Sequence, residues 1–599
     1  MAITHGEGPM MVLAGPGSGK TFVLTQRIHY LIHSLGISPE QILVITFTKL
    51  AAKEMKERFM RLQGEGYLPV TFATFHAFFF SILRLTGEYQ LSQIITDHDK
   101  IKILRMICAK YQEFTDLHTE LLSALAQEIC DVKKRGIAPV DYVSYLLDPA
   151  LFRNIYREYV SYTRQERKLD FDDLMLQCHC LLTERRDLLR MLQERYTYLL
   201  IDEFQDIEDG QFQIMRLLAS RYRNLFVVGD DDQAIYGFRG ASPGLMIDFP
   251  KIYPDAKTVT LKCNYRSTGA IVSAAQSVIL ENRFRIRKAI KPVKESGGAV
   301  EMTEYPTMQA EVQGLITKIK ALKCRKGSVA VICRTSKDLS RIALRLKEEQ
   351  IPFLMKEELT NPYLHKDATL IEAVLRFAAG DHRRAWFLKF STRIFGIVDR
   401  EKIPPLVDLA GLRKSHPSAN VRRTLNVLEE DLMMITKLPS FAAINYMDRG
   451  MHLFPEKGEA FLLLSEMAKR HPDPMEYVAL MDQLRDIQVK ALPQQQRSVK
   501  ITLLTMHASK GLEFDTVILP FVNEKTMPHH RAITSRQIEE ERRLFYVAMT
   551  RAKEALFISY HIPGQSGGDC PSRFLTPLRK LHDCSKMKCN NIHQETEHS

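Results

Sequence analysis

The sequence has no apolar run long enough to cross a lipid bilayer as a helix. Such a helix needs about 20 consecutive apolar residues, whereas this chain is 45% hydrophobic but divides its apolar residues into much shorter runs. The first residues, MAITHGEGPMM, lack the basic start and the apolar stretch of a signal peptide. These absences predict a cytoplasmic protein with no membrane partner.

Cysteine is also scarce, with 10 residues scattered along the chain. A small secreted domain held by disulfides would have a denser and more regular set. No short-period repeat or low-complexity tract is present. Because 599 residues are too many for one hydrophobic core, we expect several globular domains with reduced thiols.

Positive charge is what the composition has in excess, and the formal net charge is +12. Such a balance suits a polyanionic partner such as nucleic acid. Many basic proteins bind no nucleic acid, so charge alone leaves both interpretations open.

Short β-branched runs alternate with helical patterns, which is typical of parallel sheets with crossover helices. The sequence predicts two α/β units. Their expected strands are Met10–Leu13, Ile42–Phe47, Tyr198–Ile201 and Leu225–Val228 in the first unit, and Thr258–Leu261, Val329–Cys333, Ile501–Thr505 and Thr516–Pro520 in the second.

Each unit is interrupted by a segment that has only helical periodicity. We predict a first core over 1–85 and 185–256 with a helical insertion at 86–184. The predicted second core covers 257–380 and 500–577, with a helical insertion at 381–499. Residues 578–599 are expected to form a polar tail.

A glycine-rich loop lies between the first predicted strand and a helical run. Strand, glycine loop, Lys-Thr and helix together form the context of a nucleotide-binding P-loop, in which backbone N–H groups and a helix N-terminus surround phosphates. Lys20 would hold the β- and γ-phosphates, and the Thr21 hydroxyl would bind Mg²⁺. The loop reads Ala14-Gly15-Pro16-Gly17-Ser18-Gly19-Lys20-Thr21.

Two acids end the apolar strand Tyr198–Ile201. Taken alone, Asp202 and Glu203 would be interpreted as solvent-facing acids at a strand end. Beside a P-loop, Asp202 is expected to bind Mg²⁺, and Glu203 is expected to orient and deprotonate the attacking water.

Several further strings resemble the motifs of the UvrD/Rep/PcrA group of superfamily 1 helicases, in the family's order and over nearly the whole chain. They are Asp202-Glu203-Phe204-Gln205-Asp206 for motif II, Gly229 to Ala241 for motif III, Asn264-Tyr265-Arg266-Ser267 for motif IV, Thr505 to Phe514 for motif V and Glu540 to Ala552 for motif VI.

The resemblance implies two RecA-like P-loop NTPase domains that bind ATP between them. By resemblance, Gln233 contacts the γ-phosphate, Arg266 and Arg551 reach it as arginine fingers, and Tyr265 packs on the adenine. Glu513 would contact the ribose or polarise the cleft. A planar guanidinium can neutralise charge on the transferred phosphoryl group. Because the P-loop and the arginines are assigned to different α/β units, hydrolysis is expected to open and close the cleft.

The resemblance also implies a path for single-stranded DNA. Aromatic faces stack on bases of any sequence, and hydroxyl and imidazole groups donate to phosphates. The acids of Leu169-Asp170-Phe171-Asp172-Asp173 are instead interpreted as structural caps or hinges. The implied DNA contacts are Phe47, Thr48, Thr74, His76, Phe238, Thr505 and His507.

The sequence departs from the family's pattern in three places. The family places an adenine-reading glutamine upstream of Ala2, where this sequence begins, so weaker ATP affinity or looser base choice is expected. Val398 replaces the last glycine of a Gly-Ile-Gly turn that contacts duplex DNA, which predicts a weaker duplex grip. The chain ends soon after motif VI, so no nuclease activity is expected. The tail residues His582, Cys584, Cys589 and His593 are too irregularly spaced to predict a zinc site.

The predicted activity is therefore ATP- and Mg²⁺-dependent 3′→5′ translocation on single-stranded DNA and separation of forked duplexes, by a chain that is monomeric in isolation. A role in repair, recombination or replication restart is expected. Two alternatives remain: a DNA-stimulated ATPase that strips proteins from DNA, and a helicase subunit that works with a separate nuclease.

Overall fold

The computed structural model describes residues 1–64, 68–87, 89–111, 119–294, 298–323, 327–355, 362–395, 403–455, 457–485, 500–562 and 570–581. The chain divides into two compact units. The first unit comprises Met1–Gly298, Ala532–Glu554 and Thr576–Ser599, and the second comprises Ala299–Arg531 and Ala555–Leu575. Within the described part of the chain, no helix is both long and apolar enough to span a bilayer.

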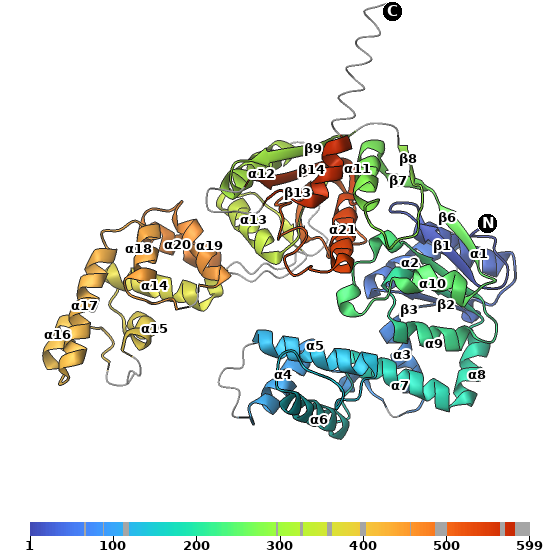
Figure 1. Ribbon diagram of the computed structural model, residues 1–599, viewed down its shortest axis with the longest axis horizontal. Helices are drawn as coiled ribbons and strands as arrows, with labels where there is room; N and C mark the ends of the chain where they lie inside the picture. The colour runs from blue at the N-terminus through green and yellow to red at the C-terminus, as the bar shows by residue number, and fades with distance from the viewer. Residues whose placement is uncertain are drawn as a thin grey trace, which may run out of the picture. The chain divides into compact units, whose positions relative to one another are not determined.

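The first unit contains a sheet of six parallel strands in the order β3-β2-β4-β5-β1-β6 (Figure 1). A two-stranded parallel sheet, β7-β8, follows it in the chain. The elements of this unit are β1 (Met10–Ala14), α1 (Lys20–His33), β2 (Ile42–Thr46), α2 (Lys49–Gln63), β3 (Thr71–Thr74), α3 (Phe75–Arg84), α4 (Asp97–Cys108), α5 (Thr119–Arg135), α6 (Pro149–Gln165), α7 (Phe171–Glu184), α8 (Arg186–Arg195), β4 (Tyr198–Ile201), α9 (Asp209–Ala219), β5 (Leu225–Gly229), α10 (Gly244–Ile252), β6 (Lys257–Leu261), β7 (Cys263–Thr268), α11 (Gly269–Ile279), β8 (Lys291–Lys294) and α21 (Ser535–Met549).

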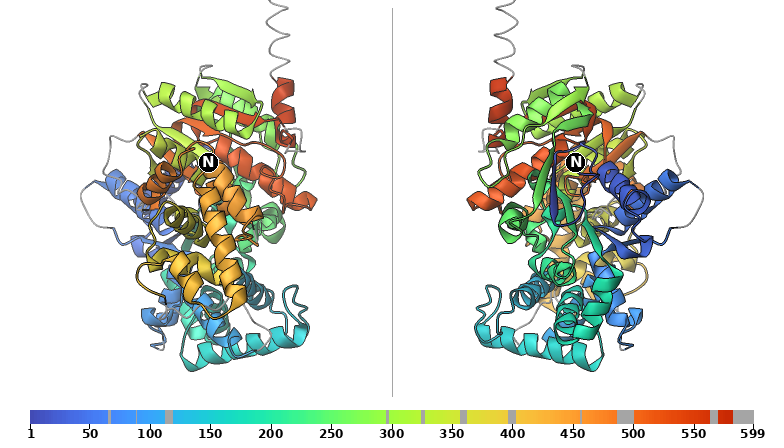
Figure 2. Two further views of the ribbon diagram at one scale, coloured as in Figure 1. Left: turned by 90° about the vertical axis from the view of Figure 1, so that its left-hand side faces the viewer. Right: turned by 90° about the vertical axis from the view of Figure 1, so that its right-hand side faces the viewer.

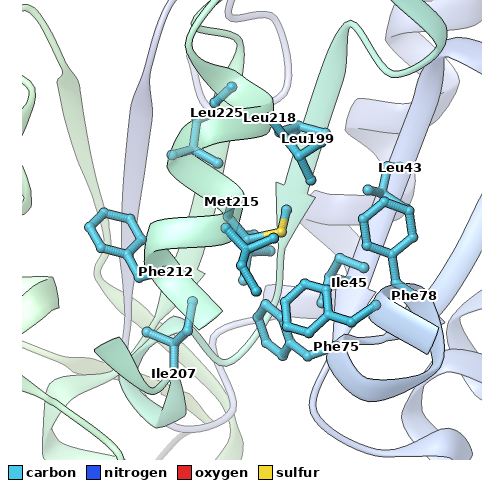
Figure 3. Packing of buried hydrophobic residues seen from close by; sticks show 14 of the residues in the cluster. Leu43, Ile45, Phe75, Phe78, Leu199, Ile207, Phe212, Met215, Leu218 and Leu225 are labelled. Atoms are coloured by element: carbon cyan, nitrogen blue, oxygen red, sulfur yellow. The ribbon is translucent and has the colours of Figure 1, made fainter. Parts of the chain in front are cut away.

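Helices cover both faces of this sheet, which is why its central strands are apolar throughout. One face packs on α1 and α2, with Leu24 and Phe59 fully buried. The other face packs on α3, α7, α8, α9 and α10. Figure 3 shows this second layer, where Ile45 of β2 faces Phe75 of α3 and Met215 of α9.

A separate cluster of helices lies in the same unit between α3 and α7. Helix α4 packs against α5 and α6 (Figure 2). These helices bury their own apolar side chains, including Leu104, Leu125 and Tyr159. An ionic network joins this cluster to α7. Lys133 Nζ lies 2.8 Å from Asp170 Oδ2 and 2.7 Å from Asp173 Oδ1. The Asp170 carboxylate also caps α7 by accepting a hydrogen bond from the Asp173 N–H at 2.9 Å, which confirms the expected cap.

The second unit contains a sheet in the order β11-β12-β10-β13-β14-β9. Helices α12 and α13 pack on it, with Ile316 and Ile342 fully buried. Its elements are β9 (Val300–Tyr305), α12 (Met308–Lys323), β10 (Val329–Cys333), α13 (Ser336–Glu348), β11 (Leu354–Met355), α14 (Lys366–Ala378), α15 (Arg384–Phe395), α16 (Leu409–Ser415), α17 (Ala419–Ile435), α18 (Ser440–Arg449), α19 (Glu459–Ala468), α20 (Pro474–Arg485), β12 (Ile501–Thr505), β13 (Phe514–Leu519) and β14 (Ala552–His561).

Helices α14 to α20 share a hydrophobic core of their own. The chain's single tryptophan, Trp386, belongs to α15 and packs against this core. Its indole N–H donates to Asp381 Oδ2 at 2.8 Å, and Lys389 Nζ lies 4.4 Å from the ring centroid.

The α/β fold with parallel strands and inserted helices is confirmed. One strand differs from the prediction. Thr258–Leu261 was assigned to the second series, but β6 pairs with β1 and extends the first sheet. The two residues at its start, Lys257 and Thr258, are exposed, as expected for an edge strand.

Candidate active site

The phosphate loop connects β1 to α1. Gly17 has φ 63° and Gly19 has φ 85°, in the left-handed region that favours glycine. A Cβ atom on Gly17 would lie 2.6 Å from Cβ of Arg266. Helix α1 starts at Lys20, and no side chain caps its first turn. The loop therefore presents backbone and a helix N-terminus, which together fit phosphate groups.

Lys20 pairs with Glu203 across this loop. Its Nζ lies 3.0 Å from Oε1 and 3.1 Å from Oε2 of Glu203. Burial alone would lower the pKa of the Lys20 ammonium, but the carboxylates of Glu203, Asp230 and Asp202 outweigh it and raise that pKa. Lys20 is therefore charged, and the carboxylates offset its positive charge. The phosphates of a nucleotide can offset the same charge in place of the carboxylates.

The two acids of motif II follow β4 directly. The Asp202 N–H donates to the Ile45 carbonyl at 2.9 Å, which continues the β2–β4 pairing by one residue. The next residue, Glu203, turns into the left-handed region with φ 51°. For a residue other than glycine this conformation is strained, and such strain is often found at functional sites. The turn directs the Glu203 carboxylate to Lys20.

A chain of hydrogen bonds continues from Glu203 to the loop after β5. Gln205 Nε2 donates to Glu203 Oε2 at 2.5 Å, and Gln205 Oε1 accepts from the Asp230 N–H at 2.8 Å. Asp230 Oδ2 then accepts from Gln233 Nε2 at 2.6 Å. Gln233 Oε1 in turn accepts from Arg551 Nη2 at 3.5 Å. The structure thereby links Lys20, Glu203, Gln233 and Arg551.

Motif IV also forms hydrogen bonds with the phosphate loop. Asn264 Nδ2 donates to the Pro16 carbonyl at 2.7 Å, and the Tyr265 N–H donates to the Gly17 carbonyl at 3.0 Å. Arg266 Nη1 donates to the Thr550 carbonyl at 3.5 Å, next to Arg551. Tyr265 is 59% exposed, so its ring is accessible to a planar ligand.

Arg551 directly precedes β14, a strand of the second sheet. By their contacts, Arg266 and Arg551 nevertheless belong to the same compact unit as the phosphate loop. The physical reason is packing: α11 contacts α21, and α21 contacts the loop after β5. The hydrogen bonds from Asn264 and Arg551 strengthen that association.

Three carboxylates come together at Asp230, Asp231 and Asp232, all buried. They do not resemble an open metal site, because Lys288 Nζ lies 2.5 Å from Asp230 and from Asp231, and Arg285 forms two hydrogen bonds with Asp232. The expected magnesium ligands are Thr21 at the start of α1 and Asp202, whose oxygens have the chemistry that Mg²⁺ prefers. The ion would neutralise phosphate charge there.

An aromatic row lies on the same unit. The rings of Phe47 and Tyr236 stack with centroids 5.1 Å apart, and the Tyr236 and Phe238 centroids are 6.1 Å apart. Phe238 is 58% exposed. Its neighbour Gly237 donates its N–H to Glu540 Oε1 at 2.8 Å, which fixes this turn to α21. Stacked, partly exposed rings of this kind can accept nucleic-acid bases of any sequence.

The other predicted DNA contacts of this unit lie at helix starts. The hydroxyls of Thr48 and Thr74 cap α2 and α3 by accepting from backbone N–H groups at 3.1 and 3.3 Å. His76 packs edge-on against Phe171, with centroids 5.0 Å apart. Burial lowers the pKa of His76, so its neutral form is favoured.

The remaining predicted residues belong to the second unit. Thr505 ends β12, and its hydroxyl accepts from the Ala508 N–H at 3.3 Å. His507 is half-buried and Glu513 is exposed, just before β13. The turn at Gly396–Arg400 and the tail residues His582 to His593 lie outside the described residues.

Sequence reasoning assigned no role to Gln205, Asp230, Tyr236 or Asn264, although all four stand inside the motif strings. Their spacing from the assigned residues was the only signal that could have identified them.

Two protein-family models match this chain. Residues 1–254 match the UvrD/REP helicase N-terminal domain, and residues 259–394 and 459–562 match the UvrD-like helicase C-terminal domain. The chain belongs to the UvrD/REP helicase family. Its two six-stranded sheets are thus the sheets of the two RecA-like domains of a UvrD-type helicase.

Individual relatives agree with this membership. YjcD of Bacillus subtilis (strain 168), which bears the provisional name of an ATP-dependent DNA helicase, is 33% identical over 96% of this chain and 80% of its own length. The ATP-dependent DNA helicase PcrA of Staphylococcus epidermidis (strain ATCC 12228 / FDA PCI 1200) is 30% identical over 96% of this chain and 85% of its own length. PcrA of Staphylococcus aureus (strain NCTC 8325 / PS 47) is 29% identical over the same fractions.

The protein is therefore an ATP-dependent DNA helicase of the PcrA/UvrD type. The glycine cradle at Gly15 and Gly17 and the buried cation Lys20 fit a nucleotide triphosphate. Hydrolysis of ATP supplies the free energy, and DNA is the polymer on which the helicase acts.

Proposed function

We propose that this helicase moves 3′→5′ along single-stranded DNA and separates forked duplexes ahead of it, using Mg²⁺ with ATP. The observation that carries the proposal is the hydrogen-bonded chain from Lys20 through Glu203, Gln205 and Asp230 to Gln233 and Arg551. The aromatic row follows the same loop, since Tyr236 and Phe238 lie three and five residues after Gln233.

The positions of these groups support the following roles. Lys20 and the loop N–H groups hold the phosphates, and Thr21 and Asp202 bind the metal ion. The phosphates of the nucleotide replace the Glu203 carboxylate as the partner of Lys20. Glu203 then orients the attacking water and accepts a proton from that water. Gln233 faces Arg551, so that a change at the γ-phosphate alters their contact, and Arg266 assists from motif IV.

The DNA track combines stacking and phosphate contacts. Phe47, Tyr236 and Phe238 stack on bases, while Thr48, Thr74 and His76 contact the backbone beside them. In the second unit, Thr505 and His507 are assigned to DNA contacts, and Glu513 is assigned to the ribose or to polarising the cleft. Such contacts tolerate every sequence, as translocation requires.

The test measures ATP hydrolysis with and without oligo-dT, followed by strand separation on duplexes that carry a 3′ or a 5′ single-stranded tail. We expect strong DNA stimulation that is lost in Lys20→Ala and Glu203→Gln, and unwinding only from the 3′ tail. Equal unwinding from both tails would contradict the polarity. Hydrolysis that displaces streptavidin from DNA ends without opening any duplex would favour a protein-stripping ATPase.

A further inference from the structure

The segment Asn282–Lys288, here called the strap, joins helix α21 to the loop after β5. On the α21 side, Asn282 Nδ2 donates to the Glu539 carbonyl at 3.0 Å, and Arg542 Nη1 donates to Asn282 Oδ1 at 2.6 Å. The N–H groups of Arg283 and Phe284 donate to the Glu539 carboxylate at 2.8 and 3.2 Å. The strap is thereby fixed to the helix that precedes Arg551.

On its other side the strap binds the three acids of motif III. Arg285 donates from Nε and Nη2 to Asp232 at 2.8 and 2.7 Å. The Ile286 N–H donates to Asp231 Oδ2 at 2.7 Å. Lys288 Nζ lies 2.5 Å from Asp230, 2.5 Å from Asp231 and 3.1 Å from Asp232.

This ion cluster is almost completely buried. The Lys288 side chain is 1% exposed, and the three acids are 0 to 1% exposed. Buried carboxylates are costly unless cations and hydrogen-bond donors satisfy them. Three carboxylates face two strap cations, so the charge balance of the cluster depends on both Lys288 and Arg285.

Asp230 is the acid through which this cluster reaches the ATP site. Its Oδ1 lies against Lys288, while its Oδ2 accepts from Gln233 Nε2 at 2.6 Å. With one oxygen held by the ammonium, the other is directed at the Gln233 amide. That amide then presents its oxygen to Arg551 at 3.5 Å.

We propose that Lys288 is a positioning residue for ATP hydrolysis, which acts through Asp230 to orient Gln233 toward Arg551. The strap thus makes the orientation of Gln233 depend on the placement of α21. The inference rests on the proposed roles of Gln233 and Arg551.

The experiment measures kcat and KM for ATP at saturating oligo-dT, together with the thermal midpoint. Lys288→Met is expected to lower kcat about 100-fold, as a small misplacement of a group at the reacting centre does, while KM changes much less. The thermal midpoint will also fall, because a buried acid loses its cation.

The double variant Lys288→Met/Asp231→Asn separates the orientation of Gln233 from the charge balance of the cluster. It removes one cation and one carboxylate together, so the cluster keeps the parent's excess of one negative charge. It is expected to regain thermal stability but not kcat. Recovery of kcat in this variant would show that Lys288 acts only through stability, and unchanged kcat in Lys288→Met would also overturn the proposal.

Arg341→Met is the matched control. Arg341 is a buried cation of the second unit, with a side chain 9% exposed, paired with Asp338 and Glu466. Its loss should lower the thermal midpoint without lowering kcat below the unfolding temperature. Lys20→Ala tests the proposed function separately: if it retains DNA-stimulated hydrolysis, the assignment of the site itself fails, whatever Lys288→Met does.

Discussion

Glu203→Gln is expected to tighten ATP binding while it stops hydrolysis. In the structure, Glu203 holds Lys20 at 3.0 Å, so a nucleotide must compete with this carboxylate for the ammonium. Glutamine has nearly the same shape but no charge, and it releases Lys20 at little cost. The loss of turnover follows because an amide cannot take a proton from water.

The expected gain in ATP affinity can be estimated from the solvent exposure of the Lys20–Glu203 pair. The side chains of Lys20 and Glu203 are 13% and 25% exposed, between a surface ion pair and a fully buried one. Surface pairs contribute about 0.2–1 kcal/mol and charge-assisted buried hydrogen bonds about 1.5–3 kcal/mol. A contribution of about 1–2 kcal/mol corresponds to a roughly 5- to 30-fold gain in affinity.

Equilibrium titration with a fluorescent, non-hydrolysable ATP analogue measures this difference directly. Parent, Glu203→Gln and Lys20→Ala are compared at one Mg²⁺ concentration, and Lys20→Ala should bind more weakly than the parent. If Glu203→Gln binds the analogue no more tightly than the parent, Glu203 does not compete for Lys20, and the reasoning from their contact is wrong.

Three further outcomes are expected. Gly17→Ala should weaken analogue binding at least about tenfold, because its Cβ would lie 2.6 Å from Arg266 in a left-handed turn, whereas Gly6→Ala, with nothing within 4 Å, should bind normally. Lys133→Met should lower the free energy of unfolding by about 1.5–3 kcal/mol in urea melts, because the buried Asp170 loses a charge-assisted hydrogen bond and keeps Lys100 at 3.4 Å, and Lys110→Met, at an exposed pair, by less than about 1 kcal/mol. Tyr236→Ala should weaken oligo-dT and oligo-dC binding alike, by about 1–3 kcal/mol in fluorescence anisotropy; a loss confined to one sequence would contradict stacking.

The parts of the fold that could be predicted are those whose signal is local. The strands β1, β4 and β10 are apolar on both faces, and the phosphate loop carries its glycines at fixed positions, so each could be recognised from a few consecutive residues. The pairing of an edge strand is not local, which is why β6 was assigned to the wrong sheet.

The same limit applies to the site. Lys288 lies 57 residues from Asp231, and in the sequence it looks like one of many surface cations. Only the folded chain shows that it is buried among three acids. Likewise, the motif strings predicted which groups belong to the site, but not that Gln205 and Asp230 connect them.

Trp386 gives this protein a spectroscopic property that its relatives need not share. Light absorbed near the red edge of the aromatic band excites indole alone, so the intrinsic emission comes from a single place, α15 of the second unit. The ring lies beside Lys389 and donates to Asp381, and both charges shift the emission if they move. The phosphate loop belongs to the other unit, so an emission change on adding nucleotide would be a label-free optical record of communication between the two units.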